Sequence, residues 1–263
     1  MGANWKITLA YDGTDFRGWQ VQPDLPTVQG LLADAIERIT GERVLPQGSG
    51  RTDAGVHALA QVASFPLAAP IPPENLRRAL NRTLPAAIRI LEAESVAPDF
   101  HARHNAQSKW YEYRIYRGEL CPPWIARYVY ALNWPLEIDA LHESAEVFVG
   151  EHDFSSFAAT DPDVAQRAMQ DAAGQGEDDN GREGNVREIY ASSWSAEGEL
   201  LIYRVHGNGF LHHMVRNLVG TMLDVGRGQI CVGDLPGILA VRERSAAGPT
   251  APARGLFLLR VNY

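Results

Sequence analysis

The sequence of 263 residues has only two cysteines and no long hydrophobic run. Cys121 and Cys231 stand far apart without the spacing of metal ligands, so we expect two reduced thiols. No apolar stretch approaches the roughly 18 residues that a membrane span needs. The first residues have neither the apolar region of a signal peptide nor a myristoylation motif. These absences predict a soluble cytoplasmic protein.

The usual nucleotide-binding motifs are also missing. The glycines of GSGRTDAGVH, residues 48–57, are not followed by the Gly-Lys-Ser/Thr of a phosphate-binding loop, and no Gly-x-Gly-x-x-Gly fingerprint is present. Asp53 in this stretch has no second carboxylate nearby, which argues against a glycosidase-like pair and against a magnesium cage. The residues around Asp53 therefore provide no motif for a nucleotide cofactor or for a magnesium ion.

The formal net charge of −8 argues at first against a nucleic-acid partner, but the charge is uneven. Residues 171–184, DAAGQGEDDNGREG, are acidic and glycine-rich, and they lie in a segment near 160–185 that we expect to be a mobile loop. Basic residues cluster in ENLRRALNR, FHARHNAQSKWYEYRIYR and HHMVRN. Net charge therefore describes solubility, and local patches must decide the partner.

Hydrophobic periodicity predicts an α+β fold in which the order strand, helix, strands, helix, strand occurs twice. The expected strands are 5–11, 43–47, 59–66, 87–95, 108–117, 186–195, 199–207 and 255–263. The expected helices are 27–40, 73–82, a helix capped by Asp139 and stopped by Gly150, 210–225 and 235–242. We interpret the order as a weak internal duplication, whose two units could join edge to edge around a cleft.

Asp53 is the first candidate for chemistry. An aspartate in a glycine-rich turn most often bonds its own backbone. Here Arg51 stands two residues away, and Gly50 and Gly55 allow a ligand to approach closely. A carboxylate kept ionised beside an arginine is a poor general acid and is better suited to act as a nucleophile or electrostatic stabiliser.

The helix expected over 210–225 is apolar on most sides, which makes Arg216 costly unless it is paired. Asp53 is our candidate partner, and an arginine reaching solvent at the helix edge is the alternative. His212 and His213 are neighbours, about 100° apart on a helix, so they are not expected to converge on one metal ion.

The strand SKWYEYRIYR alternates, with Tyr111 on the same face as Lys109 and Tyr113. Most such strands simply have one buried face. The functional alternative is a platform on which one tyrosine stacks on a base while basic residues hold phosphates.

Together, these segments resemble the tRNA pseudouridine synthase A family. The resemblance rests on YDGTDFRGWQVQ, GRTDAGVH, FHAR with WYEYRI, FLHHMVRNLVG and APARGLFLLRVNY, which occur in the family's order over nearly the whole chain. It implies a pseudouridine synthase fold, with two similar α/β halves forming a mixed, mostly antiparallel sheet flanked by helices around a central basic cleft. We expect an N-terminal subdomain, 1–106, with the Asp53 loop, and a C-terminal subdomain, 107–263.

The resemblance also implies isomerisation of uridine to pseudouridine at positions 38, 39 or 40 of tRNA, by a homodimer without a cofactor. It assigns catalysis to Asp53, base stacking to Tyr111, and structural or electrostatic roles to Arg51 and Arg216. Basic residues that flank the site are candidate contacts to the RNA backbone: Arg77, Arg78, Arg82, Arg103, Lys109 and Arg114.

The segment near 160–185 is longer and more acidic than the family pattern. The alternatives are a non-catalytic RNA-binding protein of the same fold and an aspartate-dependent nucleoside hydrolase.

Overall fold

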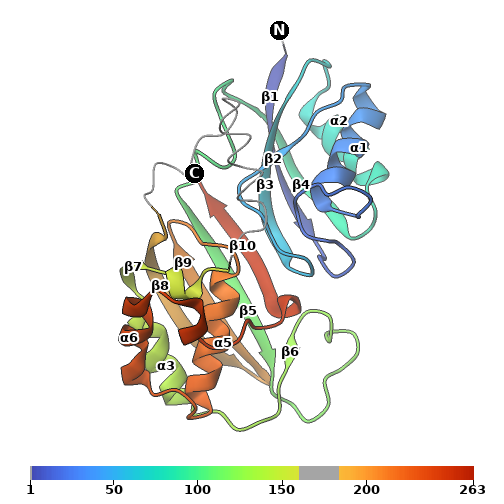
Figure 1. Cartoon of the computed structure of the whole chain (residues 1–263). Helices are drawn as coiled ribbons and strands as arrows, with labels where there is room; N and C mark the ends of the chain where they lie inside the picture. Colours follow the sequence, from blue (N-terminus) through green and yellow to red (C-terminus); the bar gives the residue numbers. More distant parts are fainter. Residues whose placement is uncertain (1, 160–183) are drawn as a thin grey trace. The chain divides into compact units, whose positions relative to one another are not determined.

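The computed structural model describes residues 2–159 and 184–263, which form two compact units (Figure 1). The first unit is Met1–Leu132 with Pro252–Tyr263, and the second is Asn133–Ala251. These two units do not have the predicted boundary after residue 106. The division into subdomains 1–106 and 107–263 stays a prediction. The predicted acidic loop near 160–185 lies almost wholly outside the described residues.

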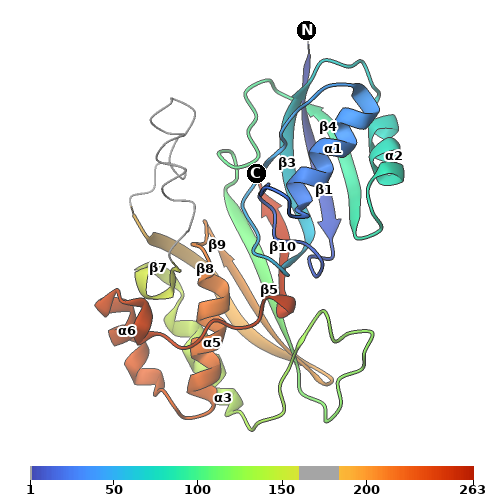
Figure 2. The ribbon, with the colours of Figure 1, turned by 45° about the vertical axis from the view of Figure 1, so that its right-hand side comes forward.

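The first unit contains a mixed sheet in the order β4-β1-β3-β10-β5 (Figure 2). Its pairings are antiparallel except for β10 with β3 and the short β6 with β5, which are parallel. The C-terminal strand therefore lies between two strands that are far from it in the sequence. The strands are β1 (Ala3–Tyr11), β2 (Gln47–Gly48), β3 (His57–Leu67), β4 (Ile88–Val96), β5 (Ser108–Tyr116), β6 (Tyr130–Ala131) and β10 (Leu256–Asn262).

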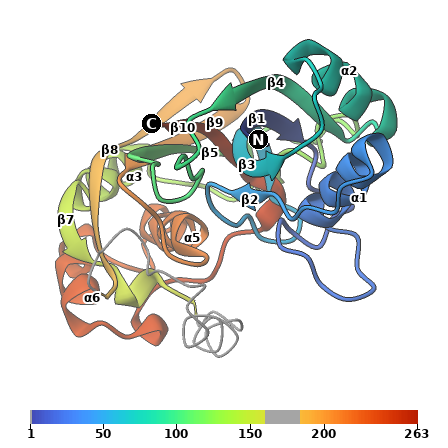
Figure 3. The same ribbon diagram turned by 90° about the horizontal axis from the view of Figure 1, so that it is seen from above.

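Two helices, α1 (Val28–Thr40) and α2 (Pro73–Thr83), lie together on one face of this sheet (Figure 3). The Thr27 hydroxyl caps α1 by accepting a hydrogen bond from the Gly30 amide at 3.3 Å. Alternation in β1 buries Trp5, Ile7, Leu9 and Tyr11. The amphipathic pattern of the sequence thus produces a helix-covered sheet.

The second unit contains an antiparallel sheet of β7 (Gly150–Asp153), β8 (Val186–Glu197) and β9 (Leu200–Gly207). The helices α3 (Ile138–Val147), α5 (Met214–Gly226) and α6 (Leu235–Val241) belong to the same unit. Helix α3 packs against β8, α5 and α6, and α5 is buried over most of its length. A turn at Gly198 joins β8 and β9, as the sequence predicted.

The mixed, mostly antiparallel sheet with its helices confirms the predicted α+β class. The bounds of two predicted elements are corrected. Residues 43–46 form no strand. Pro46 has no backbone N–H to donate to a neighbouring strand, and its carbonyl accepts a hydrogen bond from the side chain of buried Gln29. Helix α3 starts after Glu137, so Asp139 is in its first turn, and Gly150 begins β7. Among the described residues, no helix is long and apolar enough to cross a membrane.

Candidate active site

Asp53 is half-buried in the loop that leads into β3, within the first unit. Its carbonyl accepts a hydrogen bond from the Val56 amide at 3.1 Å, which closes a turn before the strand. The preceding residue, Thr52, is buried, and its hydroxyl lies 2.8 Å from the Tyr11 hydroxyl at the end of β1. The backbone next to Asp53 is therefore fixed on both sides by hydrogen bonds.

Gln61 in β3 fixes the start of the same loop. Its side chain is 0% exposed. Its Oε1 accepts hydrogen bonds from the Ser49 hydroxyl at 2.6 Å and from the Val62 amide at 3.1 Å, while its Nε2 donates to the Gly50 carbonyl at 2.9 Å. A buried amide with all these partners gives the loop one conformation, since each lost bond would leave a buried polar group unpaired.

The motif YDGTDFRGW supplies the other side of the loop. The Trp19 amide donates to the Thr52 carbonyl at 3.0 Å. Gly18 has φ of +90°, and a Cβ there would lie 2.6 Å from the Thr52 carbonyl oxygen. A Cβ at Gly13 would lie 1.9 Å from the Val56 carbonyl oxygen. Because Gly13 and Gly18 have no side chain, the backbone of YDGTDFRGW can pack directly against the backbone of the Asp53 loop.

Tyr111 lies in β5, one strand beyond β10, and is 8% exposed. Burial raises the pKa of Tyr111 well above its usual value, and the charges of Tyr11 and Asp53 act in the same direction. The phenol is therefore neutral around pH 7. The neighbouring Lys109 donates from Nζ to the Ser49 carbonyl at 2.7 Å, so β5 also contacts the Asp53 loop.

His57, at the start of β3, was not singled out by the sequence analysis. Its Nδ1 accepts a hydrogen bond from the Gly13 amide at 3.1 Å, and its Nε2 lies 3.1 and 3.2 Å from the carbonyls of Arg127 and Arg254. Asp12 Oδ1 is 3.2 Å from Nδ1, which would suit a protonated ring. Burial lowers the pKa of His57, however, and the Gly13 amide needs an acceptor, so we assign the neutral form with the proton on Nε2.

The predicted basic residues lie in varied surroundings. Arg51 is exposed, and Arg82 is exposed on α2. Arg77 and Arg78 pair with Glu74 at 2.7 and 2.9 Å. Arg114 pairs with buried Glu112 at 2.7 Å and stacks over the Phe257 ring at 4.0 Å. Arg103 is half-buried. Their contacts to RNA stay predictions.

Arg216 lies in α5 of the second unit and is half-buried. Its Nε donates to the Ala251 carbonyl at 2.8 Å, so part of its hydrogen-bonding need is met by the backbone. Its predicted pairing with Asp53 stays a prediction.

The geometry expected for His212 and His213 is wrong. Helix α5 begins at Met214 and not near residue 210, and His213 has φ of +60°, outside the helix. The two rings are tilted, with centroids 4.0 Å apart. The argument that a helical rotation separates them therefore does not apply.

The first unit thus combines a half-buried carboxylate, on a loop fixed by buried hydrogen bonds, with a buried, neutral phenol in β5. Such a site can place a carboxylate against a bound ligand without loop reorganisation. Base stacking on the Tyr111 ring stays a prediction.

Comparison with known proteins gives the same indication over nearly the whole length. Residues 7–105 and 144–263 match the family described as "tRNA pseudouridine synthase". A tRNA pseudouridine synthase A of Solibacter usitatus (strain Ellin6076) is 50% identical over 259 residues, with 98% of each chain covered. That of Moorella thermoacetica (strain ATCC 39073 / JCM 9320) is 46% identical over 260 residues, also with 98% of each covered. The chain therefore belongs to the tRNA pseudouridine synthase A family of isomerases.

Proposed function

We propose that the protein converts uridine to pseudouridine at positions 38, 39 or 40 in the anticodon stem-loop of tRNA, with Asp53 as the essential catalytic carboxylate. One observation carries the assignment of the site. Asp53 and Tyr111 come from separate segments, yet Lys109, two residues before Tyr111 in β5, donates to the Ser49 carbonyl of the Asp53 loop at 2.7 Å. This contact ties the strand of the aromatic residue to the loop of the carboxylate, and both groups serve the proposed reaction on a flipped uracil.

The target base is inside a helical stem, so it must be flipped out, at a cost of a few kcal/mol. Stacking on the Tyr111 ring offsets about 1–3 kcal/mol of this cost. In the reaction the N1–C1′ bond breaks, the uracil turns, and C5 bonds to C1′. C5 loses its proton and N1 takes up a proton, so the product is an isomer of the substrate and no oxidant or reductant is needed.

Three roles of Asp53 fit this balance: addition to the base, attack on C1′, or removal of a sugar proton. Each role needs an ionised carboxylate held near the junction of ribose and base. Arg51 and Arg216 are the proposed electrostatic partners of this carboxylate. Tyr111 could also assist departure of the C5 proton. Since its phenol is neutral, it would act by hydrogen bonding, not as a preformed phenolate.

The proposal includes a homodimer with two similar halves around a basic cleft, acting in the cytoplasm. The backbone contacts proposed for the cleft are the six basic residues Arg77, Arg78, Arg82, Arg103, Lys109 and Arg114. The free thiols of Cys121 and Cys231 suit a reducing compartment.

Tritium release from tRNA transcripts labelled at uridine C5 tests the function. The parent protein should release tritium, mapped to the anticodon stem-loop, and Asp53→Asn should bind tRNA but release none. The non-catalytic alternative predicts binding without release by either protein. The nucleoside-hydrolase alternative predicts that free uridine is consumed.

A further inference from the structure

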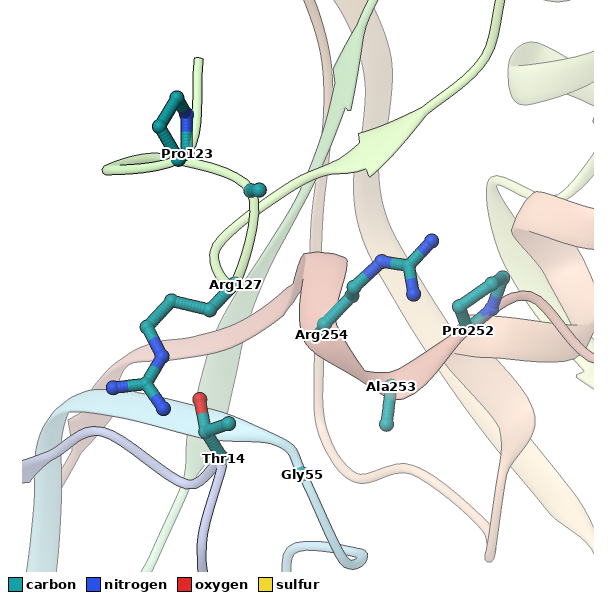
Figure 4. A pocket seen from close by; sticks show the side chains of 8 residues that line it. Thr14, Gly55, Pro123, Arg127, Pro252, Ala253 and Arg254 are labelled. Carbon is teal, nitrogen blue, oxygen red and sulfur yellow. The ribbon is translucent and has the colours of Figure 1, made fainter. Parts of the chain in front are cut away.

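A pocket of about 570 Å³ opens beside the Asp53 loop, wholly within the first unit (Figure 4). Its wall is largely apolar, formed by side chains such as Pro123, Ala126 and Ala253. Its polar groups are the hydroxyl of Thr14 and the guanidinium groups of Arg127 and Arg254. The volume lies within the range of small-ligand sites, about 300–1,000 Å³. None of the residues assigned above to catalysis or RNA binding lines it.

The two arginines present cations at different parts of the pocket. Arg127 ends beside Thr14, whereas the guanidinium of Arg254 extends away from Thr14, towards the segment that carries β6 (Figure 4). Arg254 is held by the bond from its Nε to the Val129 carbonyl at 3.1 Å. Both side chains are solvent-exposed. Two separated cations beside an apolar wall suit a ligand with two anionic groups flanking a ring.

Arg127 has acidic neighbours, Asp12 and Asp15, each with an oxygen 3.5 Å from its guanidinium. Asp12 is already bonded by Thr14 and by the Tyr128 hydroxyl at 2.9 Å. Asp15 is exposed, and such a pair contributes little in water. An incoming phosphate can therefore replace Asp15 as the partner of Arg127.

The pocket is connected to the catalytic loop by direct contacts. Gly55, two residues after Asp53, lines it, and a Cβ at Gly55 would meet the Ala253 side chain at 3.3 Å. The neutral His57 ring bonds the carbonyls of both arginines and lies four residues after Asp53. A ligand in this pocket is thus positioned relative to Asp53 through the backbone.

We propose that this pocket binds one nucleotide of the tRNA strand next to the target uridine. Its ribose packs on the proline and alanine wall, and its two flanking phosphates contact Arg127 and Arg254. The inference rests on the proposed function and extends it to a subsite for a neighbouring nucleotide. It makes Arg127 and Arg254 residues that set the position of the substrate strand.

The test compares Arg127→Gln, Arg254→Gln and the double variant by tRNA binding over a series of salt concentrations. Each single variant should raise Kd about tenfold, and the double variant more. The slope of log Kd against log salt should become shallower by about 1 per arginine removed. KM in the tritium assay should rise in parallel. Arg127→Lys and Arg254→Lys should retain most of the salt dependence, because they keep the charge.

Arg38→Gln is the matched control, since Arg38 is exposed in α1 and does not line the pocket. It removes the same charge and should leave Kd and slope almost unchanged. Asp15→Asn should tighten binding by freeing Arg127. Slopes for the pocket variants equal to that of Arg38→Gln would overturn the inference, and so would losses seen with whole tRNA but not with an anticodon stem-loop RNA. Tritium release by the parent and not by Asp53→Asn would uphold the proposed function in either case.

Discussion

The hydrogen bond between Tyr11 and Thr52 gives the sharpest prediction about the Asp53 loop. Both side chains are buried, and their hydroxyl oxygens are 2.8 Å apart. Tyr11→Phe or Thr52→Val removes one of the two hydroxyls, so the remaining hydroxyl loses this hydrogen bond. Each single change should therefore lower the free energy of unfolding by about 1–3 kcal/mol. The double change leaves neither hydroxyl, so its cost should be well below the sum of the two.

The assay is urea unfolding of the four proteins in the double-mutant cycle, with kcat from tritium release measured alongside. We expect a coupling energy of about 1–2 kcal/mol. We also expect kcat to fall roughly 10- to 100-fold in the single variants, because Thr52 precedes Asp53 and small displacements of a reacting group are costly. Costs that add within about 0.3 kcal/mol would refute the reasoning.

Ser144→Ala is the matched control for this cycle. Ser144 is a fully buried hydroxyl in α3 of the second unit, where it donates to the Leu141 carbonyl at 2.9 Å. Its removal should cost about 1 kcal/mol of stability without lowering kcat. An equal loss of kcat in this variant would mean that the activity follows global stability and not the geometry of the Asp53 loop.

Three further predictions concern residues around the same loop. Gly18→Ala should sharply reduce both stability and tritium release, because Gly18 has φ of +90° and the new Cβ would lie 2.6 Å from the Thr52 carbonyl oxygen. A variant with an unchanged melting temperature and unchanged activity would contradict this. Gln61→Leu should cost about 2–5 kcal/mol by unpairing buried groups at Ser49 and Gly50, as measured by urea unfolding. Since burial lowers the pKa of His57 in the folded protein, the unfolded chain binds the extra proton first, so stability should be full above about pH 6.5 and decline below it. Unfolding titrations from pH 8 to 5 test this, and His57→Gln should flatten that part of the profile.

The sequence by itself determined most elements of the fold. Alternation in residues 5–11 predicted β1, and the periodic leucines and isoleucines between Thr27 and Gly41 predicted α1. These patterns are local, because a strand or helix buries one face set by its own residues. The unusual run around Asp53 marked the loop for chemistry, and the resemblance of the motifs predicted the family, which the comparisons show.

Local patterns were not sufficient where backbone partners decided the outcome. The periodic stripe extended the helix back to Phe210, but the chain turns at His213, and α5 starts one residue later. Asp139 has the chemistry of a cap, yet Glu137 precedes the first helical residue. The pattern of side chains does not specify which amide begins the helix.

Only the tertiary structure decided what holds Asp53 in place. Tyr11 is 41 residues from Thr52, and Arg254 is 197 residues from His57, so no sequence window contains these pairs. The parallel pairing of β10 with β3 brings the C-terminal segment beside the loop that leads into β3. A buried polar group needs a partner wherever the fold provides one. The sequence therefore predicts the reacting residue, while the fold determines which buried groups hold its loop in place.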